Sequence, residues 1–205
     1  MVYSDRAEFN KLAEEAGIIF VGYPVGGVYP YLPSGARMFR RLQRLLEELL
    51  EGTGHEPILF PSLIPLTLFR REVDFFEGFS PEALLAEKTL SGRMLDEPLV
   101  LRPTSEVPIY YVFSQLIKSW RDLPLKVYQN VTVYRIETKA TAPFFRLREV
   151  TGFSEEHAFA RDEGEAREIF EGAIGIYSSF LDRLGIPYLI VESPPWDLFP
   201  GARRN

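Results

Sequence analysis

Two stretches of alternating side chains in the middle of the chain carry the charged groups best suited to chemistry. Period-two alternation over residues 125–137 indicates a strand that places Arg135 and Glu137 on one face. A return strand is expected over residues 144–153. Three of its side chains share one face: Phe144, Arg146 and Arg148. If the register brings the two faces together, the guanidinium groups would hold a polyphosphate, because Arg pairs its planar donors with phosphate oxygens and keeps its charge.

The same pattern also fits a sheet surface with Arg–Glu pairs and no ligand. A further polar set follows on the return strand, at odd-numbered positions: Phe153, Glu155 and His157. Because Arg146 and Arg148 are even-numbered, both sets cannot face one site along an unbroken strand. We therefore expect a β-bulge at Thr151–Gly152, since a bulge shifts side-chain facing by one residue and Gly suits it.

A long amphipathic helix is predicted over residues 34–50, capped by Ser34 and ended by Gly52. Its charges run against the helix dipole, with glutamates in the rear half and four arginines in front: Arg37, Arg40, Arg41 and Arg44. Two interpretations stay open. The arginines form a solvated face with Arg44 paired to Glu47 or Glu48, or they contact a dimer partner or RNA.

The remaining patterns position these groups within an α+β fold. In chain order they predict a short helix near Pro81–Lys88, a strand over 98–102, a helix from Thr104 or Ser105 to about Trp120, a helix over 162–184 and a strand over 187–192. Hairpin strands with helices grouped beside them favour an antiparallel β-sheet flanked by helices over a doubly wound sheet.

Composition excludes several classes of protein. The chain has 205 residues, a formal net charge of −6, no cysteine and two histidines. Disulfides are therefore excluded, a metal site is not expected, and the whole chain is not a nucleic-acid clamp. No apolar run is long enough for a membrane span and the first residues are charged, so we expect a cytoplasmic protein without membrane contact.

Short motifs resemble the class II aminoacyl-tRNA synthetases. Tyr-Arg-Ile-Glu at 134–137, followed by Arg-Leu-Arg-Glu at 146–149, resembles motif 2 of that class, and the long helix with Ile-Leu-Phe-Pro at 58–61 is similar to motif 1. Four segments resemble prolyl-tRNA synthetases of the archaeal and eukaryotic type: 101–106, 134–141, 153–157 and 194–202. The similarity runs from about residue 18 to residue 202.

The resemblance implies an ATP site. Arg135 and Arg146 would be the catalytic residues, with Arg135 on the α-phosphate and the prolyl carboxylate and Arg146 on the γ-phosphate. Glu137 would meet the adenine amino group, and Phe144 would stack on the ring. Mg²⁺ would enter with ATP, and no separate metal site is implied.

The resemblance also implies a proline site that shares Arg135. Thr104 and Glu106 would receive the ring nitrogen, and three residues would line the pocket: Phe153, Glu155 and His157. A cationic ring amine suits the Glu106 carboxylate, and a flat apolar side chain suits a pyrrolidine ring. A purely structural role for His157 and simple packing for Phe153 stay open.

The resemblance further implies one catalytic domain over 1–205, incomplete at its C-terminal end, without motif 3 or an anticodon-binding domain. The sequence departs from the pattern at Ala142, Val150 and Leu198. Two functions follow. One is proline activation with ATP and transfer to tRNA, in a homodimer formed through the motif 1 region. The other is a catalytically incomplete synthetase-like paralogue or fragment that binds nucleotide, amino acid or a partner chain.

Overall fold

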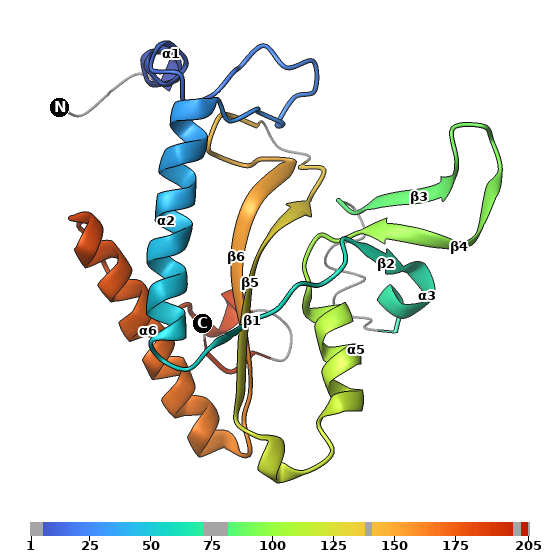
Figure 1. Ribbon diagram of the computed structural model, residues 1–205, viewed down its shortest axis with the longest axis vertical. Coiled ribbons are helices and arrows are strands. Elements are labelled where there is room, and N and C mark those ends of the chain that lie inside the picture. The colour runs from blue at the N-terminus through green and yellow to red at the C-terminus, as the bar shows by residue number, and fades with distance from the viewer. Residues whose placement is uncertain (1–5, 72–81, 138–140, 199–201, 205) are drawn as a thin grey trace.

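The structure is a computed structural model that describes residues 6–71, 82–137, 141–198 and 202–204. Two three-stranded sheets form its framework (Figure 1). The first sheet has the order β1 (Glu56–Pro57), β5 (Leu125–Tyr134) and β6 (Glu149–Phe159). The second has the order β2 (Leu63–Pro65), β4 (Met94–Leu101) and β3 (Leu84–Lys88). All pairs are antiparallel except the short β1–β5 pair. The predicted α+β class with an antiparallel sheet is confirmed.

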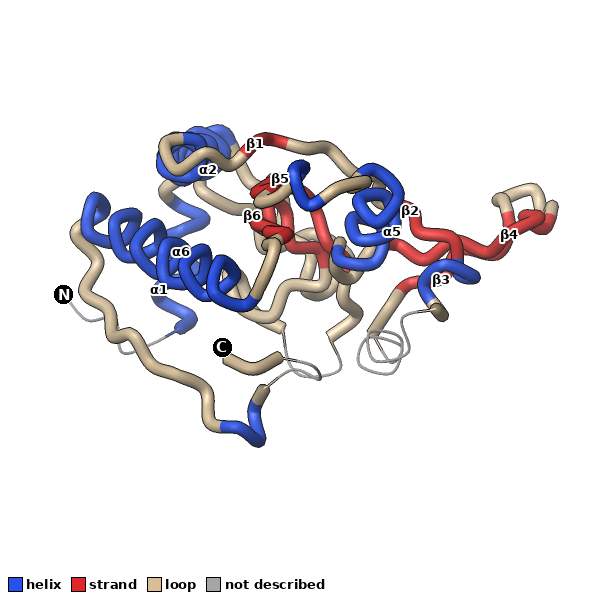
Figure 2. Tube along the Cα trace, turned by 90° about the horizontal axis from the view of Figure 1, so that it is seen from below, coloured by secondary structure: helices blue, strands red, loops and turns tan. Residues whose placement is uncertain are grey.

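Helices cover both faces of the first sheet. On one side lie α2 (Pro33–Glu51) and α6 (Glu163–Leu184), and on the other lies α5 (Glu106–Leu116), as Figures 1 and 2 both show. The shorter helical elements are α1 (Arg6–Glu15), α3 (Leu66–Phe69) and the 3-10 turns Trp120–Asp122 and Pro195–Asp197. No helix in these parts of the chain is long and apolar enough to cross a membrane.

Two apolar clusters hold the layers together. The first joins α2 and α6 to β5 through Leu46, Leu50, Tyr128 and Ile176. The second packs the β2-β4-β3 sheet against α3 and α5 with four buried side chains: Ile64, Phe69, Val100 and Val107. Each buried aliphatic or aromatic side chain stabilises the fold by about 1.5–3 kcal/mol. The β5–β6 pair is therefore fixed from the α2 side, and α5 is fixed by its contact with the second sheet.

The long amphipathic helix is confirmed, but its predicted start is wrong. The residue before the helix is Leu32, and Pro33 occupies the first helical position. Ser34 does not act as the cap, because it already lies inside the first turn, where its Oγ accepts a weak hydrogen bond from Arg37. Proline is favoured at this position because its missing N–H would lack an intrahelical partner anyway. Gly52 ends the helix as predicted.

Other predicted boundaries also differ from the structure. The region predicted as a helix near Pro81–Lys88 contains strand β3, which pairs with β4, and Pro81 lies outside the described residues. The helix after Ser105 ends at Leu116 rather than near Trp120. The predicted strand over 187–192 has no ladder partner among the described residues and remains exposed coil. The β3 outcome depends on pairing with a distant segment, which overrides local preference.

The predicted β-bulge is confirmed at Thr151–Gly152. Along the β5–β6 ladder Val131 pairs with Phe153, but Val133 pairs with Val150, so two residues of β6 face one residue of β5. Gly152 has φ +68°, a left-handed conformation that favours glycine. A Cβ atom at Gly152 would lie 2.2 Å from the Phe39 ring of α2. Both the backbone and the neighbouring helix therefore require glycine here.

Replacing Gly152 by alanine is expected to destabilise the protein strongly. The left-handed conformation costs an L-residue about 1–2 kcal/mol, and overpacking against Phe39 adds about 1–3 kcal/mol. Chemical denaturation of G152A should show a free energy of unfolding lower by about 2 kcal/mol or more. The matched control is G172A on α6, where a Cβ meets no atom within 4 Å. That variant should be as stable as the parent or slightly more so. Equal stability of G152A and the parent would contradict the bulge geometry.

Candidate active site

The loop between β4 and α5 supplies the first two candidate residues. Thr104 is buried, and its hydroxyl donates a hydrogen bond to the carboxylate of Glu106. Glu106 is the first residue of α5, where the positive end of the helix dipole favours a carboxylate. The Thr104–Glu106 pair therefore presents a fixed anionic group at the N-terminal end of α5.

The middle of β6 supplies a buried carboxylate and a histidine. Glu155 accepts a hydrogen bond of 2.7 Å from the amide of Gln129 on β5, and its other oxygen lies 3.3 Å from Nε2 of His157. Burial alone would raise the pKa of Glu155. The 3.3 Å ion pair with His157 and the hydrogen bond from Gln129 outweigh it and hold the pKa below its ordinary value of 4.5. Glu155 is therefore a buried anion whose oxygens are already engaged.

Tyr110 of α5 links these two groups. Burial, followed by the nearby charges of Glu106 and Glu155, raises the pKa of its hydroxyl. Its ring meets the His157 ring edge-on at 5.9 Å between centroids. Tyr110 therefore lies near both carboxylates, Glu106 and Glu155. The proline-site residues predicted on α5 and β6 are thus close to one another.

Arg135 completes this region from the end of β5. Its Nε donates a 2.8 Å hydrogen bond to the carbonyl oxygen of Pro103, just before Thr104. Its guanidinium carbon lies 5.5 Å from the centre of the Phe153 ring, a cation–π contact. Arg135 is therefore held between the α5 loop and the first residue of β6 beyond the bulge. The predicted set of Thr104, Glu106, Arg135, Phe153, Glu155 and His157 is brought together.

The second half of the predicted phosphate cradle is arranged differently. The strand β5 ends at Tyr134 and β6 begins only at Glu149, so the residues between them do not alternate along a strand. Phe144 and Arg146 both have positive φ, of 65° and 50°. Arg146 is exposed, and its guanidinium forms no hydrogen bond or ion pair with a described residue. The predicted common face of Phe144, Arg146 and Arg148 on one strand is therefore wrong.

Arg148 has a structural role in this geometry. Its guanidinium donates to the carbonyl oxygens of Gly26 and Glu137, at 3.1 and 3.3 Å. Phe144 packs edge-on against Phe9 and Tyr31, with ring centroids at 5.6 and 6.4 Å. Arg148 thus ties the glycine-rich loop near residue 26 to the end of the β5 segment. Of the three predicted arginines, Arg135 alone contacts the proline-site residues.

Comparisons with known proteins show the family to which the chain belongs. The family described as tRNA synthetase class II core domain (G, H, P, S and T) matches residues 89–203. The chain belongs to this family. The class II core of this chain contains every candidate residue of the active site, and the resemblance predicted from its motifs is confirmed.

Relatives of this class II core are named proline–tRNA ligases. One from Methanopyrus kandleri is 46% identical over 203 residues, covering 97% of this chain and 41% of the relative. One from Pyrococcus abyssi is 43% identical over 195 residues, covering 95% of this chain and 40% of the relative. The chain therefore spans about two fifths of the length of these relatives.

Solved structures give the same picture for the class II core. Giardia lamblia prolyl-tRNA synthetase, in complex with prolyl-adenylate, has a TM-score of 0.91 at 34% identity, covering 96% of this chain and 39% of that one. Cryptosporidium parvum prolyl-tRNA synthetase, complexed with halofuginone and AMPPNP, also has a TM-score of 0.91, at 28% identity, with 99% and 41% coverage.

Sequence reasoning missed three residues that lie beside the candidate site. Gln129 and Arg102 are almost fully buried, and Tyr110 contacts His157. Arg102 donates to the carbonyl oxygens of Thr132 and Phe60, at 2.9 and 2.7 Å, and so ties the β1–β2 segment to β5. Parity could have revealed Gln129, because it shares the odd-numbered face of β5 with Val131. Arg102 carried no such signal, since its partners are backbone carbonyls far along the chain.

The described residues hold no group of three or more His, Cys, Asp or Glu side chains arranged for a metal ion. Mg²⁺ that enters with a nucleotide is held largely by the phosphates and by one or two carboxylates, so such a cage is not required for it.

Replacing Glu155 by glutamine should make stability less dependent on pH. A carboxyl group whose pKa is lower in the folded state than in the unfolded state stabilises the protein at pH values above the unfolded-state pKa. This stabilisation is lost as the pH falls through the folded-state pKa. E155Q should therefore be less stable than the parent by about 1–3 kcal/mol near pH 7. The difference should shrink as pH falls below about 4.5.

The measurement is urea unfolding at a series of pH values. E8Q, at an exposed position on α1, is the matched control and should follow the parent at every pH. A difference between E155Q and the parent that stays constant down to about pH 3 would show that Glu155 is not a buried anion in the folded state.

Proposed function

We propose that the chain contributes the amino-acid and nucleotide site of a prolyl-tRNA synthetase, which activates proline with ATP and transfers it to tRNA. The observation that carries this proposal is Arg135, held between the Pro103 carbonyl oxygen and the Phe153 ring beside the Thr104–Glu106 pair. A zwitterionic amino acid needs an anionic and a cationic group at opposite ends, and this arrangement supplies both. The proline–tRNA ligase relatives support the choice of proline.

The proposed reaction requires the protein mainly to align the proline carboxylate with the α-phosphate of ATP. In the proposed step a carboxylate oxygen of proline attacks the α-phosphorus of ATP, an acyl–phosphate bond forms, and pyrophosphate leaves with the bonding electron pair. No protein nucleophile is required. Arg135 would align the carboxylate with the α-phosphate and offset the developing charge, which typically contributes about 10²–10³ in rate. Thr104 and Glu106 would hold the ring nitrogen.

The pocket lining has a definite physical role in this proposal. Phe153 offers a flat apolar surface next to Arg135. Glu155 and His157 would line the pocket from β6, and the 2.7 Å bond from Gln129 keeps the Glu155 side chain in one position. Because the oxygens of Glu155 are engaged, we assign it to shaping the pocket. The direct contact with the ring amine goes to Glu106.

The nucleotide end of the site rests on fewer contacts. ATP would enter with Mg²⁺, and Arg146, exposed and without a described partner, suits a γ-phosphate that brings its own negative charge. Glu137 would meet the adenine amino group. Phe144 would stack on the adenine ring.

Partners follow from the same proposal. Transfer requires tRNA, and the β1–β2 segment after α2 is the proposed homodimer contact. Leu59 in that segment is 90% exposed, although it belongs to an apolar run between two prolines. A single exposed leucine is common on protein surfaces, so the proposed dimer contact rests on the resemblance of this segment to motif 1.

A second candidate is a non-catalytic module that binds nucleotide, amino acid or a partner chain. The exposed run from Ile186 to Val191 favours it, because Leu189 is 90% and Val191 80% exposed. Such an apolar segment without ladder partners among the described residues suits pairing with a strand from another chain.

Replacing Arg135 by alanine should abolish proline activation. The measurement is proline-dependent ATP–pyrophosphate exchange, by the chain alone and with the C-terminal portion of a proline–tRNA ligase supplied as a second chain. We expect R135A to lose at least about 100-fold. R135K should recover only part of this, because lysine lacks the planar pair of donors. The control is R93A, at an exposed turn between β3 and β4, which should keep full exchange.

Ligand binding separates the two candidate functions. Calorimetry with a non-hydrolysable prolyl-adenylate analogue should show binding by the parent chain and loss of binding by R135A. If the chain binds the analogue but shows no exchange even with the second chain present, the non-catalytic module is supported. If it binds neither the analogue nor proline, the proposed site is wrong.

A further inference from the structure

Gln129 on β5 has both ends of its side-chain amide bound to groups from distant parts of the chain. The residue is only 1% exposed. Its Oε1 accepts a 3.0 Å hydrogen bond from the backbone N–H of Phe60 in the β1–β2 segment, and its Nε2 donates a 2.7 Å bond to Glu155 on β6. Gln129 therefore joins the β1–β2 segment to a residue of the proposed proline pocket.

Only one orientation of the Gln129 amide satisfies both of its partners. A backbone N–H can only donate and a carboxylate can only accept, so the oxygen must face Phe60 and the nitrogen must face Glu155. A rotation of the amide by 180° would set donor against donor and acceptor against acceptor in a buried region, where unpaired polar groups are unfavourable. The Glu155 carboxylate consequently meets a donor in one fixed position.

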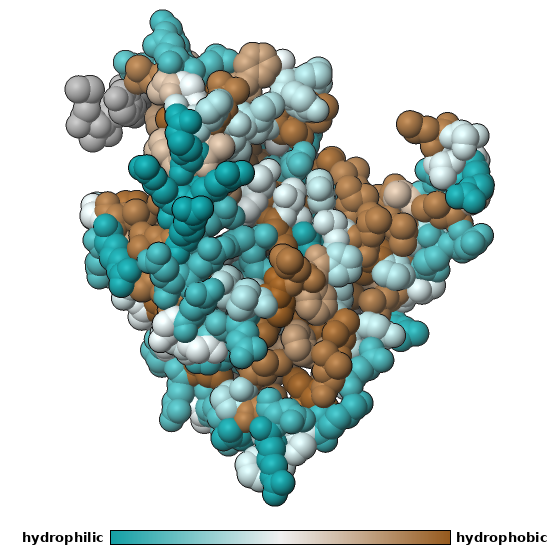
Figure 3. Space-filling view, in the orientation of Figure 1, coloured by the Kyte–Doolittle hydropathy of each residue, from teal (hydrophilic) through white to brown (hydrophobic). Residues whose placement is uncertain are grey.

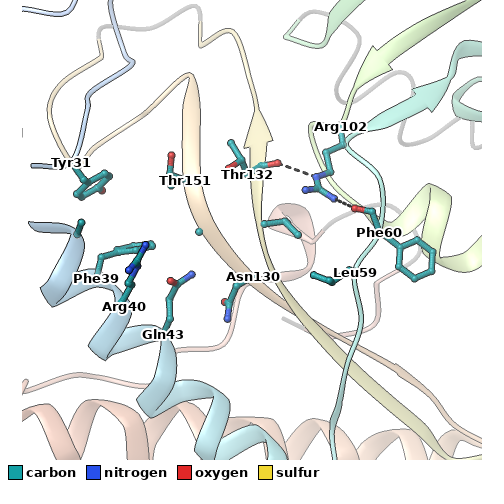
Figure 4. A pocket seen from close by; sticks show the side chains of 13 residues that line it. Tyr31, Phe39, Arg40, Gln43, Leu59, Phe60, Arg102, Asn130, Thr132 and Thr151 are labelled. Atoms are coloured by element: carbon teal, nitrogen blue, oxygen red, sulfur yellow. Dashed lines mark hydrogen bonds between the residues drawn. The ribbon is translucent and has the colours of Figure 1, made fainter. Parts of the chain in front are cut away.

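The Phe60 end of this link is itself held by two other elements. Arg102 is 4% exposed, and its guanidinium donates bonds of 2.7 and 2.9 Å to the carbonyl oxygens of Phe60 and Thr132, drawn as dashed lines in Figure 4. The Phe60 ring meets the ring of Phe113 on α5, with centroids 6.0 Å apart. Backbone and side chain of Phe60 are both fixed, so the donor that orients Gln129 has a defined place.

Aromatic rings connect the same region to the second buried residue of the pocket on β6. The ring of Phe113 meets that of Phe159 at 5.2 Å between centroids. Tyr110 meets the rings of both Phe159 and His157, at 5.6 and 5.9 Å. Nε2 of His157 lies 3.3 Å from the second oxygen of Glu155. Each oxygen of Glu155 therefore has a partner whose position is set by packing or by hydrogen bonds.

We propose that Gln129 is a positioning residue that sets the size selectivity of the amino-acid pocket by holding the Glu155 carboxylate in one place. This inference rests on the proposed function, because it takes the pocket to be the proline site. Gln129 itself contacts no substrate. A pocket whose lining is fixed discriminates against one additional methylene group by about 10–200-fold, and a lining that can move accommodates the larger ligand.

The neighbouring residue Asn130 offers a matched comparison. It makes the same kind of bond, a 2.6 Å donation to the Glu47 carboxylate, but its side chain lies on the α2 side of the sheet, as Figure 4 shows. Successive residues of a strand face opposite sides of a sheet. Glu47 belongs to α2, along which Figure 3 shows hydrophilic side chains gathered. A change at Asn130 therefore removes an equivalent amide–carboxylate bond without reaching the amino-acid pocket.

The first test is calorimetry with two non-hydrolysable adenylate analogues, one carrying proline and one carrying its homologue with a six-membered ring. The parent chain should prefer the proline analogue by about 10–200-fold. Q129M keeps a side chain of similar length but makes neither hydrogen bond, so this preference should fall by at least about five-fold. N130L is the control and should keep the preference of the parent. A general loss of stability would weaken both ligands alike and leave the ratio unchanged.

The second test uses pH to restore the missing donor. Q129E keeps an acceptor for Phe60 but places a carboxylate against Glu155, and the repulsion of two buried like charges raises the pKa of the pair until they share one proton. That proton again donates toward Glu155. Q129E should therefore bind the proline analogue at least about 10-fold more weakly than the parent at about pH 8, and should approach the parent at about pH 5.5.

Other titratable and charged groups near Glu155 are the same in the parent and in Q129E. They are His157 of β6, Arg102 after β4, and Tyr110 with Glu106 on α5. The ratio of the two affinities at each pH therefore removes their own titration. N130D makes the same charge change against Glu47 and should bind the analogue like the parent at both pH values.

The outcomes separate this inference from the proposed function. If Q129M and Q129E keep the affinity and the preference of the parent, the inference is overturned and the proposed function stands. It is also overturned if both analogues weaken equally and the defect of Q129E does not change with pH, because Gln129 would then contribute to stability alone. A parent chain that binds neither analogue overturns both. Circular dichroism checks the fold of each variant, and Q129E at about pH 5.5, with both bonds restored, is expected to be folded.

Discussion

The extra residue in β6 at Thr151–Gly152 determines which side chains reach the α5 face of the sheet. Beyond the bulge, Phe153, Glu155 and His157 pair with Val131, Gln129 and Val127, and all of them face one side. A regular ladder would move this set to the α2 side, because a shift of one residue exchanges the two faces. Gly152 permits the bulge for two reasons: its backbone is left-handed, and it has no Cβ that would clash with Phe39. The packing of α2 and the composition of the active site are thereby coupled through one glycine.

Periodicity predicted the parts of the site that lie within regular elements. The alternation in β6 and the parity conflict with Arg148 were enough to place the bulge at the correct residues. The residues between Tyr134 and Glu149 were predicted less well, because positive φ at Phe144 and Arg146 removes the alternation on which the prediction depended. Arg148 shows the same limit in another way. Its partners are backbone carbonyls of Gly26 and Glu137, and the identity of those residues carries no sign of the contact.

The arrangement of charge on α2 now has a partial physical explanation. Glutamates in its rear half are unfavourable for the helix dipole, but Glu47 and Glu51 gain hydrogen bonds to Asn130 and Tyr128 of β5. Bonds to a charged group contribute about 1.5–3 kcal/mol, which exceeds the dipole cost of about 0.3–1 kcal/mol per charge. The glutamates are therefore explained by the folded chain itself. The arginines in the front half are exposed and form no ion pair with a described carboxylate, as expected of a solvated face.

The two faces of strand β5 hold two different carboxylates in place. Gln129 fixes the Glu155 carboxylate on the α5 side, and Asn130 fixes Glu47 on the α2 side. Two neighbouring amides therefore hold two carboxylates in opposite directions, each stabilised by a charge-assisted hydrogen bond. On the α5 side, the engaged Glu155 leaves Glu106 as the acid suited to a substrate amine and Arg135 as the cation suited to a carboxylate. In the proposed site this division would set the polarity of a bound amino acid, with its nitrogen toward the start of α5 and its carboxylate toward Arg135.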